Sequence, residues 1–277
     1  MKFTQKILSL FVLITVVCLL QRPYRVLADD GHSHDSASHH KLHFSHPLIA
    51  ESPSPDTKMR FDYGILDFEQ EGETTTENRI RFEAEYAFHP SFSIETDIPF
   101  VILDPANASN QSDLGNIEIA LKFANFAFEQ HDLLLGYGIE FGLPTGDDDK
   151  GIGSDHIFEI ETFLNAGYKL RNLEIVAFTA FGIPTNQRQE EEVEAELGYN
   201  FSLLYHIKPW LQGLLEVDGQ TVLSGEEAGT SVLNITPGVK IRPFSISGLR
   251  IGLAASLPVS NNKEFDTRAL LSMFYHF

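Results

Sequence analysis

The sequence contains a single cysteine, Cys18, among its 277 residues. An intramolecular disulfide and a cysteine-based zinc site are therefore both excluded. Basic residues are also scarce, because 20 Lys and Arg stand against 39 Asp and Glu, which gives a formal net charge of −19 at pH 7. A charge this negative would repel the phosphate backbone, so nucleic acid is not expected as a partner.

The first 28 residues have the pattern of a secretory signal peptide. Two early lysines precede the uncharged apolar run Ile7–Leu20, and Val26-Leu27-Ala28 places small or branched residues where a signal peptidase cleaves. As a helix, this run would reach only about 21 Å, which is too short for a membrane anchor. Lipidation at Cys18 is disfavoured because the two residues before it are both valines. Residues 1–28 are therefore predicted to be a cleaved signal peptide, and no later apolar run is long enough for a transmembrane helix.

Six of the eleven histidines lie between Asp29 and His46. Neutral imidazole is a common ligand of divalent transition metals. We therefore expect residues 29–57 to form an unpacked, His-rich periplasmic segment with a proline-rich linker. The alternative is a solvated polar linker, and a segment placed just before the first strand would also be positioned to plug a pore. The predicted ligands of zinc, nickel, cobalt or copper are His32, His34, His39, His40, His43 and His46.

From residue 58 onward, apolar and polar residues alternate. In Arg79–His89, for example, even positions are apolar and all odd positions except Ala87 are polar, as in a strand with one apolar and one polar face. Most such runs exceed the ~9–11 residues of a tilted membrane-crossing strand. Length and the signal peptide argue against a soluble β-sandwich, so residues 58–277 are predicted to form an all-β, closed antiparallel transmembrane β-barrel of about 12 strands. The runs are 58–70, 77–89, 91–103, 112–126, 131–143, 155–169, 173–183, 191–207, 210–222, 230–242, 247–259 and 264–277.

The connections between these runs are predicted to alternate between long and short, beginning with a long one at Glu71–Thr76. Bacterial outer-membrane barrels have long external loops and tight periplasmic turns, so both termini are predicted to be periplasmic, in the outer membrane of a Gram-negative cell. The terminal Phe277 resembles the signal that the barrel-assembly machinery recognises. Aromatic residues predict a periplasmic belt of Phe88, Phe92, Tyr168, Tyr205, Trp210, Tyr275 and Phe277, and an outer belt of Phe100, Phe141, Phe181 and Phe265.

Charged residues on the polar faces of the strands are mostly acidic. In a barrel they face the lumen, because lipid penalises charge, and an acidic lumen favours cations or neutral solutes. The alternative is that these groups mainly pair with one another. The principal lumen residues are predicted to be Arg79, Arg81, Glu83, Glu85, Glu95, Asp97, Glu159, Glu161, Glu192, Glu194, Glu196, Glu216 and Asp218.

Two short motifs indicate a family. With the signal peptide, the long strands and the terminal Phe, the segments Ser112–Asn116 (SDLGN) and Pro144–Asp147 (PTGD) resemble the MetA-pathway phenol-degradation family of outer-membrane barrels, whose members are labelled transporters. The resemblance implies uptake of aromatic compounds and no catalytic residue, and the His-rich segment departs from the family's usual start.

The function predicted from the sequence is an outer-membrane channel or transporter for small solutes with a metal-binding tail. The alternatives are a non-conducting barrel that anchors a metal-sequestering or sensing module, and a purely structural barrel. An enzyme is not expected, and no catalytic residue is assigned: Ser154 and His156 lie close in sequence, but no oxyanion hole is evident beside them.

Overall fold

The computed structural model describes residues 42–70, 73–185, 195–225, 227–243, 246 and 248–277. The predicted signal peptide, four of the predicted metal ligands (His32, His34, His39 and His40) and the predicted lumen residues Glu192 and Glu194 lie outside the described residues.

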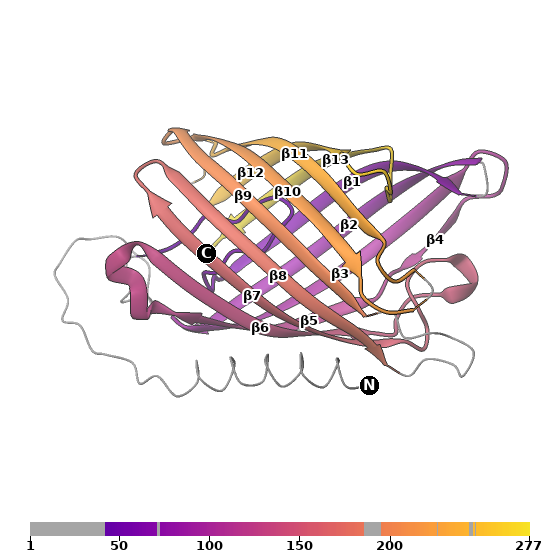
Figure 1. Ribbon diagram of the computed structural model, residues 1–277. Coiled ribbons are helices and arrows are strands. Elements are labelled where there is room, and N and C mark those ends of the chain that lie inside the picture. The colour runs from indigo at the N-terminus through magenta and orange to yellow at the C-terminus, as the bar shows by residue number, and fades with distance from the viewer. Residues whose placement is uncertain (1–41, 71–72, 186–194, 226, 244–245, 247) are drawn as a thin grey trace.

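The chain forms a closed antiparallel β-barrel (Figure 1). Successive strands pair with one another around the sheet, and β1 pairs with both β2 and β13, which closes the ring. The strands are β1 (Lys58–Gln70), β2 (Glu73–His89), β3 (Phe92–Pro105), β4 (Gln111–Leu114), β5 (Ile117–Asn125), β6 (Leu133–Leu143), β7 (Phe158–Leu170), β8 (Leu173–Thr185), β9 (Glu196–Lys208), β10 (Leu211–Val222), β11 (Ser231–Ile241), β12 (Leu249–Pro258) and β13 (Thr267–His276).

The predicted count of twelve spanning strands is confirmed. Strands β4 and β5 both pair with β3 and are separated only by Gly115 and Asn116, so they are two parts of one spanning strand. Two short 3₁₀ helices complete the described structure, η1 (Phe126–His131) and η2 (Asp148–Lys150). Neither has the length or the apolar composition that a membrane-crossing helix requires.

The two faces of the strands have opposite character. In β2, Phe82 and Tyr86 are exposed on the outside, whereas Glu83 and Glu85 are buried inside. An outer surface this apolar is stable when lipid covers it. The seven aromatic residues of the predicted periplasmic belt are all exposed, but Phe181 and Phe265 of the predicted outer belt are buried. Phe265 packs under the Arg268 guanidinium instead.

Both ends of the barrel domain lie at one mouth, here called the terminus end. Lys58 at the start of β1 lies opposite His276 at the end of β13, and the backbone N–H of Phe277 donates to the carbonyl of Thr57 over 3.1 Å. The opposite mouth, which carries β4 and η2, is the loop end (Figure 1). The predicted long first connection is wrong, because β1 and β2 stay paired from Lys58–Glu85 to Gln70–Glu73. The threonines at 74–76 favour strand and extend the hairpin.

Thiol labelling tests the predicted orientation. Single cysteines at Asp148 in the loop-end connection and at Pro90 or Pro209 in tight turns suit this test, because Cys18 lies in the predicted signal peptide. With the terminus end in the periplasm, a bulky thiol reagent should label the cysteine at 148 on intact cells and leave those at 90 and 209 unlabelled. All three should react after permeabilisation. Labelling at 90 and 209 but not at 148 on intact cells would reverse the topology.

Candidate functional site

Residues 42–57, here called the lumen segment, lie inside the barrel at the terminus end (Figure 1). The side chains of Phe44 and Ser52 are 0% exposed, and that of Leu48 is 1% exposed. The expectation of an unpacked segment over 29–57 is therefore wrong for its described part. A free peptide of this composition has too few apolar groups to fold alone, but the barrel wall supplies the partners that it lacks.

Apolar contacts hold one side of the lumen segment. On the lumen face near the terminus end, several strands carry apolar rather than polar residues. One of them is Phe274, whose ring centroid lies 4.7 Å from the guanidinium carbon of Arg60. Burying such side chains contributes roughly 1.5–3 kcal/mol each. The core formed in this way contains Leu42, Phe44 and Leu48 from the segment, and Ala124, Leu134, Val176, Leu204, Leu214 and Phe274 from the wall.

Two glycines open the wall to the largest apolar side chains of the segment. A Cβ added at Gly167 would lie 2.8 Å from the ring of Phe44, and one added at Gly252 would lie 2.4 Å from Cδ2 of Leu48. Both distances are too short for real carbon contacts, so only glycine permits this close approach. The two positions act as sockets for Phe44 and Leu48.

The carboxylate of Glu216 binds the backbone of the segment. Its two oxygens accept hydrogen bonds from three consecutive N–H groups: Leu48 at 2.7 Å, Ile49 at 3.2 and 3.3 Å, and Ala50 at 3.3 Å. The hydroxyl of Ser202 also donates to Glu216, over 2.9 Å. Successive N–H groups that converge on one anion form a strong, charge-assisted contact. Glu216 therefore holds the lumen segment and is not available to line an open path.

Other carboxylates, one on a wall strand and one in η1, bind the segment's backbone in the same manner. Glu174 accepts from the N–H of Ser45 over 2.8 Å, and Glu129 accepts from that of Leu42 over 2.9 Å. Basic and amide side chains donate to carbonyls of the segment. The donor–carbonyl pairs are Arg60–Leu48, Lys240–His46, Lys169–His43 and Asn165–Ser52.

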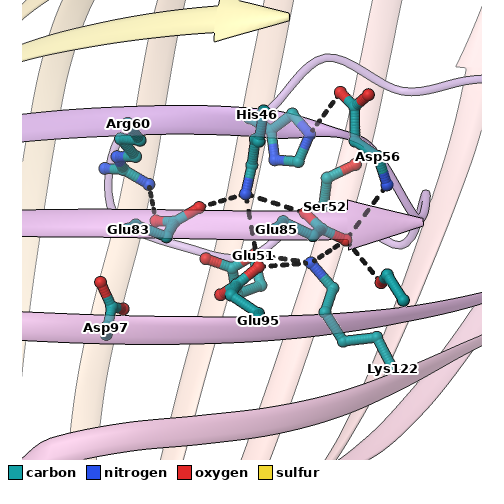
Figure 2. Close-up of polar contacts among 12 residues, drawn as sticks. His46, Glu51, Ser52, Asp56, Arg60, Glu83, Glu85, Glu95, Asp97 and Lys122 are labelled. Atoms are coloured by element: carbon teal, nitrogen blue, oxygen red, sulfur yellow. Dashed lines mark hydrogen bonds and ion pairs between the residues drawn. The ribbon is translucent and has the colours of Figure 1, made fainter. Parts of the chain in front are cut away.

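A buried ion-pair network lies beneath the segment (Figure 2). Lys122 contacts Glu51 of the segment at 3.0 Å, Glu85 at 3.2 Å and Glu95 at 3.1 Å. Lys58 contacts Glu83, Glu85 and Glu95. Burial alone would raise the pKa of Glu51, but Lys122 and Lys58 outweigh it and hold the pKa well below its usual range. At this level of the lumen, the acids pair with bases, as the alternative interpretation of the charges predicted.

The same pairing extends along neighbouring strands. Arg81 contacts Asp62 at 2.7 Å and Asp97 at 3.3 Å. Closer to the loop end, Arg79 contacts Glu77 at 2.6 Å, and Asp218 lies 3.4 Å from Arg268.

Acids gather on the lumen face toward the loop end. Glu140 on β6 lies directly opposite Glu161 on β7, and Glu159 and Glu118 both lie opposite Gly142. These four side chains are only partly buried, unlike Glu83 and Glu216. Like charges at opposed positions repel one another. Glu196 also follows the inward-facing alternation of β9.

Of the predicted metal ligands, His43 and His46 converge on Asp56 within the lumen segment. Nε2 of His46 lies 3.3 Å and Nε2 of His43 lies 3.6 Å from Oδ2 of Asp56. Nδ1 of His276, on the last strand, donates to the same oxygen over 2.7 Å. Burial and the nearby Lys58 lower the pKa of His46 to about 3, so its imidazole is neutral. Burial alone would raise the pKa of Asp56, but hydrogen bonds from His276, His43 and His46 keep it far below the usual range.

The two motifs that suggested a family contact each other at the loop end. Asn116 Oδ1 accepts from the N–H groups of Gly146 at 3.2 Å and Ser154 at 2.8 Å, and Thr145 Oγ1 donates to the Gly115 carbonyl over 2.9 Å. A Cβ at Gly146 would lie 2.4 Å from the carbonyl oxygen of Ile152, so glycine permits this close fold. The motifs therefore fasten the β6–β7 connection over the break between β4 and β5.

The same connection contains Ser154, His156 and Asp148, which together do not form a catalytic triad. Ser154 Oγ lies 3.2 Å and Asp148 Oδ2 lies 2.6 Å from Nδ1 of His156, so both use the same ring nitrogen. A triad requires one partner on each nitrogen. Ser154 Oγ also accepts from the N–H of Ile157 over 3.1 Å, which gives it a structural role in the turn.

Comparisons with known structures support the fold. An outer membrane channel from Pseudomonas putida F1 is similar, with a TM-score of 0.64 and 13% identity over 81% of this chain and 96% of that chain. The NanC porin has a TM-score of 0.55 and 7% identity over 80% and 98% of the two chains. The beta domain of the Bordetella autotransporter BrkA has a TM-score of 0.51 and 8% identity over 80% and 99%. No family model and no curated protein matches the sequence. The resemblance to the MetA-pathway family stays a prediction, and what these comparisons show is the fold of an outer-membrane β-barrel.

Proposed function

We propose that this protein is an outer-membrane channel for small solutes that is closed at its periplasmic end by the lumen segment. The observation that carries this proposal is the segment itself, which fills the terminus end of the barrel while remaining one continuous chain with β1. Inward side chains beside it, such as Glu216 and Ser272, are 0% exposed. Solutes would pass only when residues 42–57 move.

The contacts that hold the segment suit reversible closure. Most of them join backbone groups of the segment to side chains of the wall, and water can replace hydrogen bonds of this kind when the segment leaves. The wall contributes a carboxylate at Glu216 and cations at Arg60 and Lys240. These side chains would stay in the opened lumen and keep it hydrated.

The open channel would favour cations or neutral solutes. Glu118, Glu140, Glu159 and Glu161 line the loop end of the lumen, and acid-lined pores select against anions. Aromatic solutes, which the family resemblance implies, would therefore enter more readily as neutral phenols than as carboxylates. The alternative function is a non-conducting barrel that anchors a metal-binding module, and the convergence of His43 and His46 on Asp56 favours it. Conductance in planar bilayers, measured on a variant whose lumen segment is released, distinguishes the two functions.

Filling the two glycine sockets should release the segment. In a Gly167→Val, Gly252→Val double variant, the new side chains occupy the space of Phe44 and Leu48. Each overpacked site costs about 1–3 kcal/mol, so the released fraction should rise at least about tenfold. A cysteine at Ser52, which is 0% exposed, should then react with maleimide at least about tenfold faster, and single-channel conductance should increase.

The control variant adds the same number of methyl groups as the socket variant. A Gly198→Val, Gly213→Val protein adds them where a new Cβ meets only ordinary contacts, at 3.8 Å from Ala180 and 3.5 Å from Ile207. It should behave like the wild type. If the socket variant folds, exposes the cysteine and still fails to conduct, the channel function is wrong and the non-conducting alternative is favoured.

Lumen acids should set ion selectivity. A Glu140→Gln, Glu159→Gln, Glu161→Gln triple variant, made in the released background, should lose most of the cation preference measured by reversal potentials across a salt gradient. A second triple variant, Asp104→Asn, Asp149→Asn, Glu227→Gln, removes the same charge from exposed positions and should change selectivity much less. Anion preference in the parent protein would contradict the acidic-lumen argument.

A further inference from the structure

We infer that Asp56, His46 and His276, with His43 beside them, form a divalent transition-metal site that joins the lumen segment to the last strand. This site differs from the tail site expected from the sequence. It uses only two of the six histidines predicted there and recruits a carboxylate and a histidine 220 positions away from Asp56. The chemical class of ligand is a borderline divalent cation, such as Zn²⁺, Co²⁺ or Ni²⁺.

The geometry of the donor atoms carries the inference. One ligand atom from each of His46, Asp56 and His276 lies within 4.8 Å of the others, which is the spacing of atoms that share one ion. Nε2 of His43 lies 3.6 Å from Oδ2 of Asp56, next to this group of three but outside it. Two histidines and one carboxylate supply three of the four ligands of tetrahedral zinc and leave one position for water or for the neighbouring His43.

The hydrogen bonding of the site without metal is also unusual. Three imidazole nitrogens approach a single oxygen, Oδ2 of Asp56, at 2.7, 3.3 and 3.6 Å. A carboxylate oxygen has two lone pairs, so it does not satisfy three donors equally well. A cation between His46, Asp56 and His276 would instead bind a nitrogen lone pair from each of the two imidazoles and an oxygen of the carboxylate.

Neighbouring charges and exposure distinguish this cluster from the two other groups of potential ligands in the described residues. Glu51, Glu83 and Glu95 already contact Lys58 or Lys122, which occupy the place of a cation. The group of Asp148, Asp155 and His156 lies in the loop-end connection and is more exposed. In contrast, His46 is 2% exposed and packs beside Phe274, and their ring centroids lie 6.2 Å apart.

The position of the site suggests its role, which rests on the proposed function. His46 and Asp56 lie near the two ends of the lumen segment, and His276 lies in the barrel wall at the terminus end. An ion bound between them would fix the segment in the lumen, so metal would favour the closed channel.

Zinc binding by full-length mature protein in detergent tests the site separately from conduction. The starting protein carries His32→Asn, His34→Asn, His39→Asn and His40→Asn, which removes the earlier histidines. It should bind one equivalent of Zn²⁺ by titration calorimetry, and Co²⁺ should give the strong visible bands of a four-coordinate nitrogen–oxygen site. His276→Asn, and separately Asp56→Asn, should weaken binding at least about 100-fold.

Control variants and a second readout make the outcome decisive. His89→Asn and His131→Asn change exposed histidines and should leave the affinity unchanged. Zn²⁺ should also slow maleimide labelling of a cysteine at Ser52 in the starting protein but not in its His276→Asn derivative. Absence of stoichiometric binding, or binding that survives both site substitutions in folded protein, would overturn the metal site. Metal binding without any effect on conductance would leave the site intact and overturn only its role in closure.

Discussion

The structure depends on one constraint, which is that a peptide placed inside a barrel must have its backbone polar groups satisfied. An unpaired buried N–H or C=O costs about 1–3 kcal/mol, and the lumen segment is neither helix nor strand. Glu216 meets this constraint for three successive N–H groups, while Arg60 and Lys240 meet it for carbonyls. The charged lumen is therefore partly a binding surface for the protein's own chain.

The barrel could be predicted from the sequence because its pattern is repeated in every strand. Alternation in runs such as Arg79–His89 fixes which side chains face lipid, and the resulting twelve spanning strands are those of the structure. Connections were less predictable. The first predicted loop is instead part of an extended hairpin, because the threonines at 74–76 belong to β2. Charged and turn-forming residues do not specify where a strand ends once it has left the membrane.

The place of the lumen segment before the first strand indicated that it could plug a pore, but its packing could not be predicted from its own composition, because its apolar partners lie in the barrel wall. Yet the strands contain a signal of its presence. Leu134, Val176, Leu204, Leu214 and Phe274 occupy inward positions near the terminus end, where a water-filled pore would carry polar residues. Glycines at 167 and 252 leave space on the same face. Apolar lumen residues that gather at one end predict a partner that covers them. Only part of the histidine cluster could be predicted. His43 and His46 were predicted as metal ligands, but no local spacing in the sequence links His276 to His46.

The balance between closing and opening follows from the same contacts. Buried ion pairs such as Lys122–Glu51 often contribute little net stability because their desolvation offsets their attraction. The net preference for the lumen therefore rests mainly on Phe44 and Leu48, which contribute roughly 1.5–3 kcal/mol each. Because the segment continues directly into β1 at Lys58, it would stay at high effective concentration after a release and would return readily. Sustained opening consequently requires something that competes for its contacts, and a metal ion shared by His46, Asp56 and His276 would shift this equilibrium toward closure.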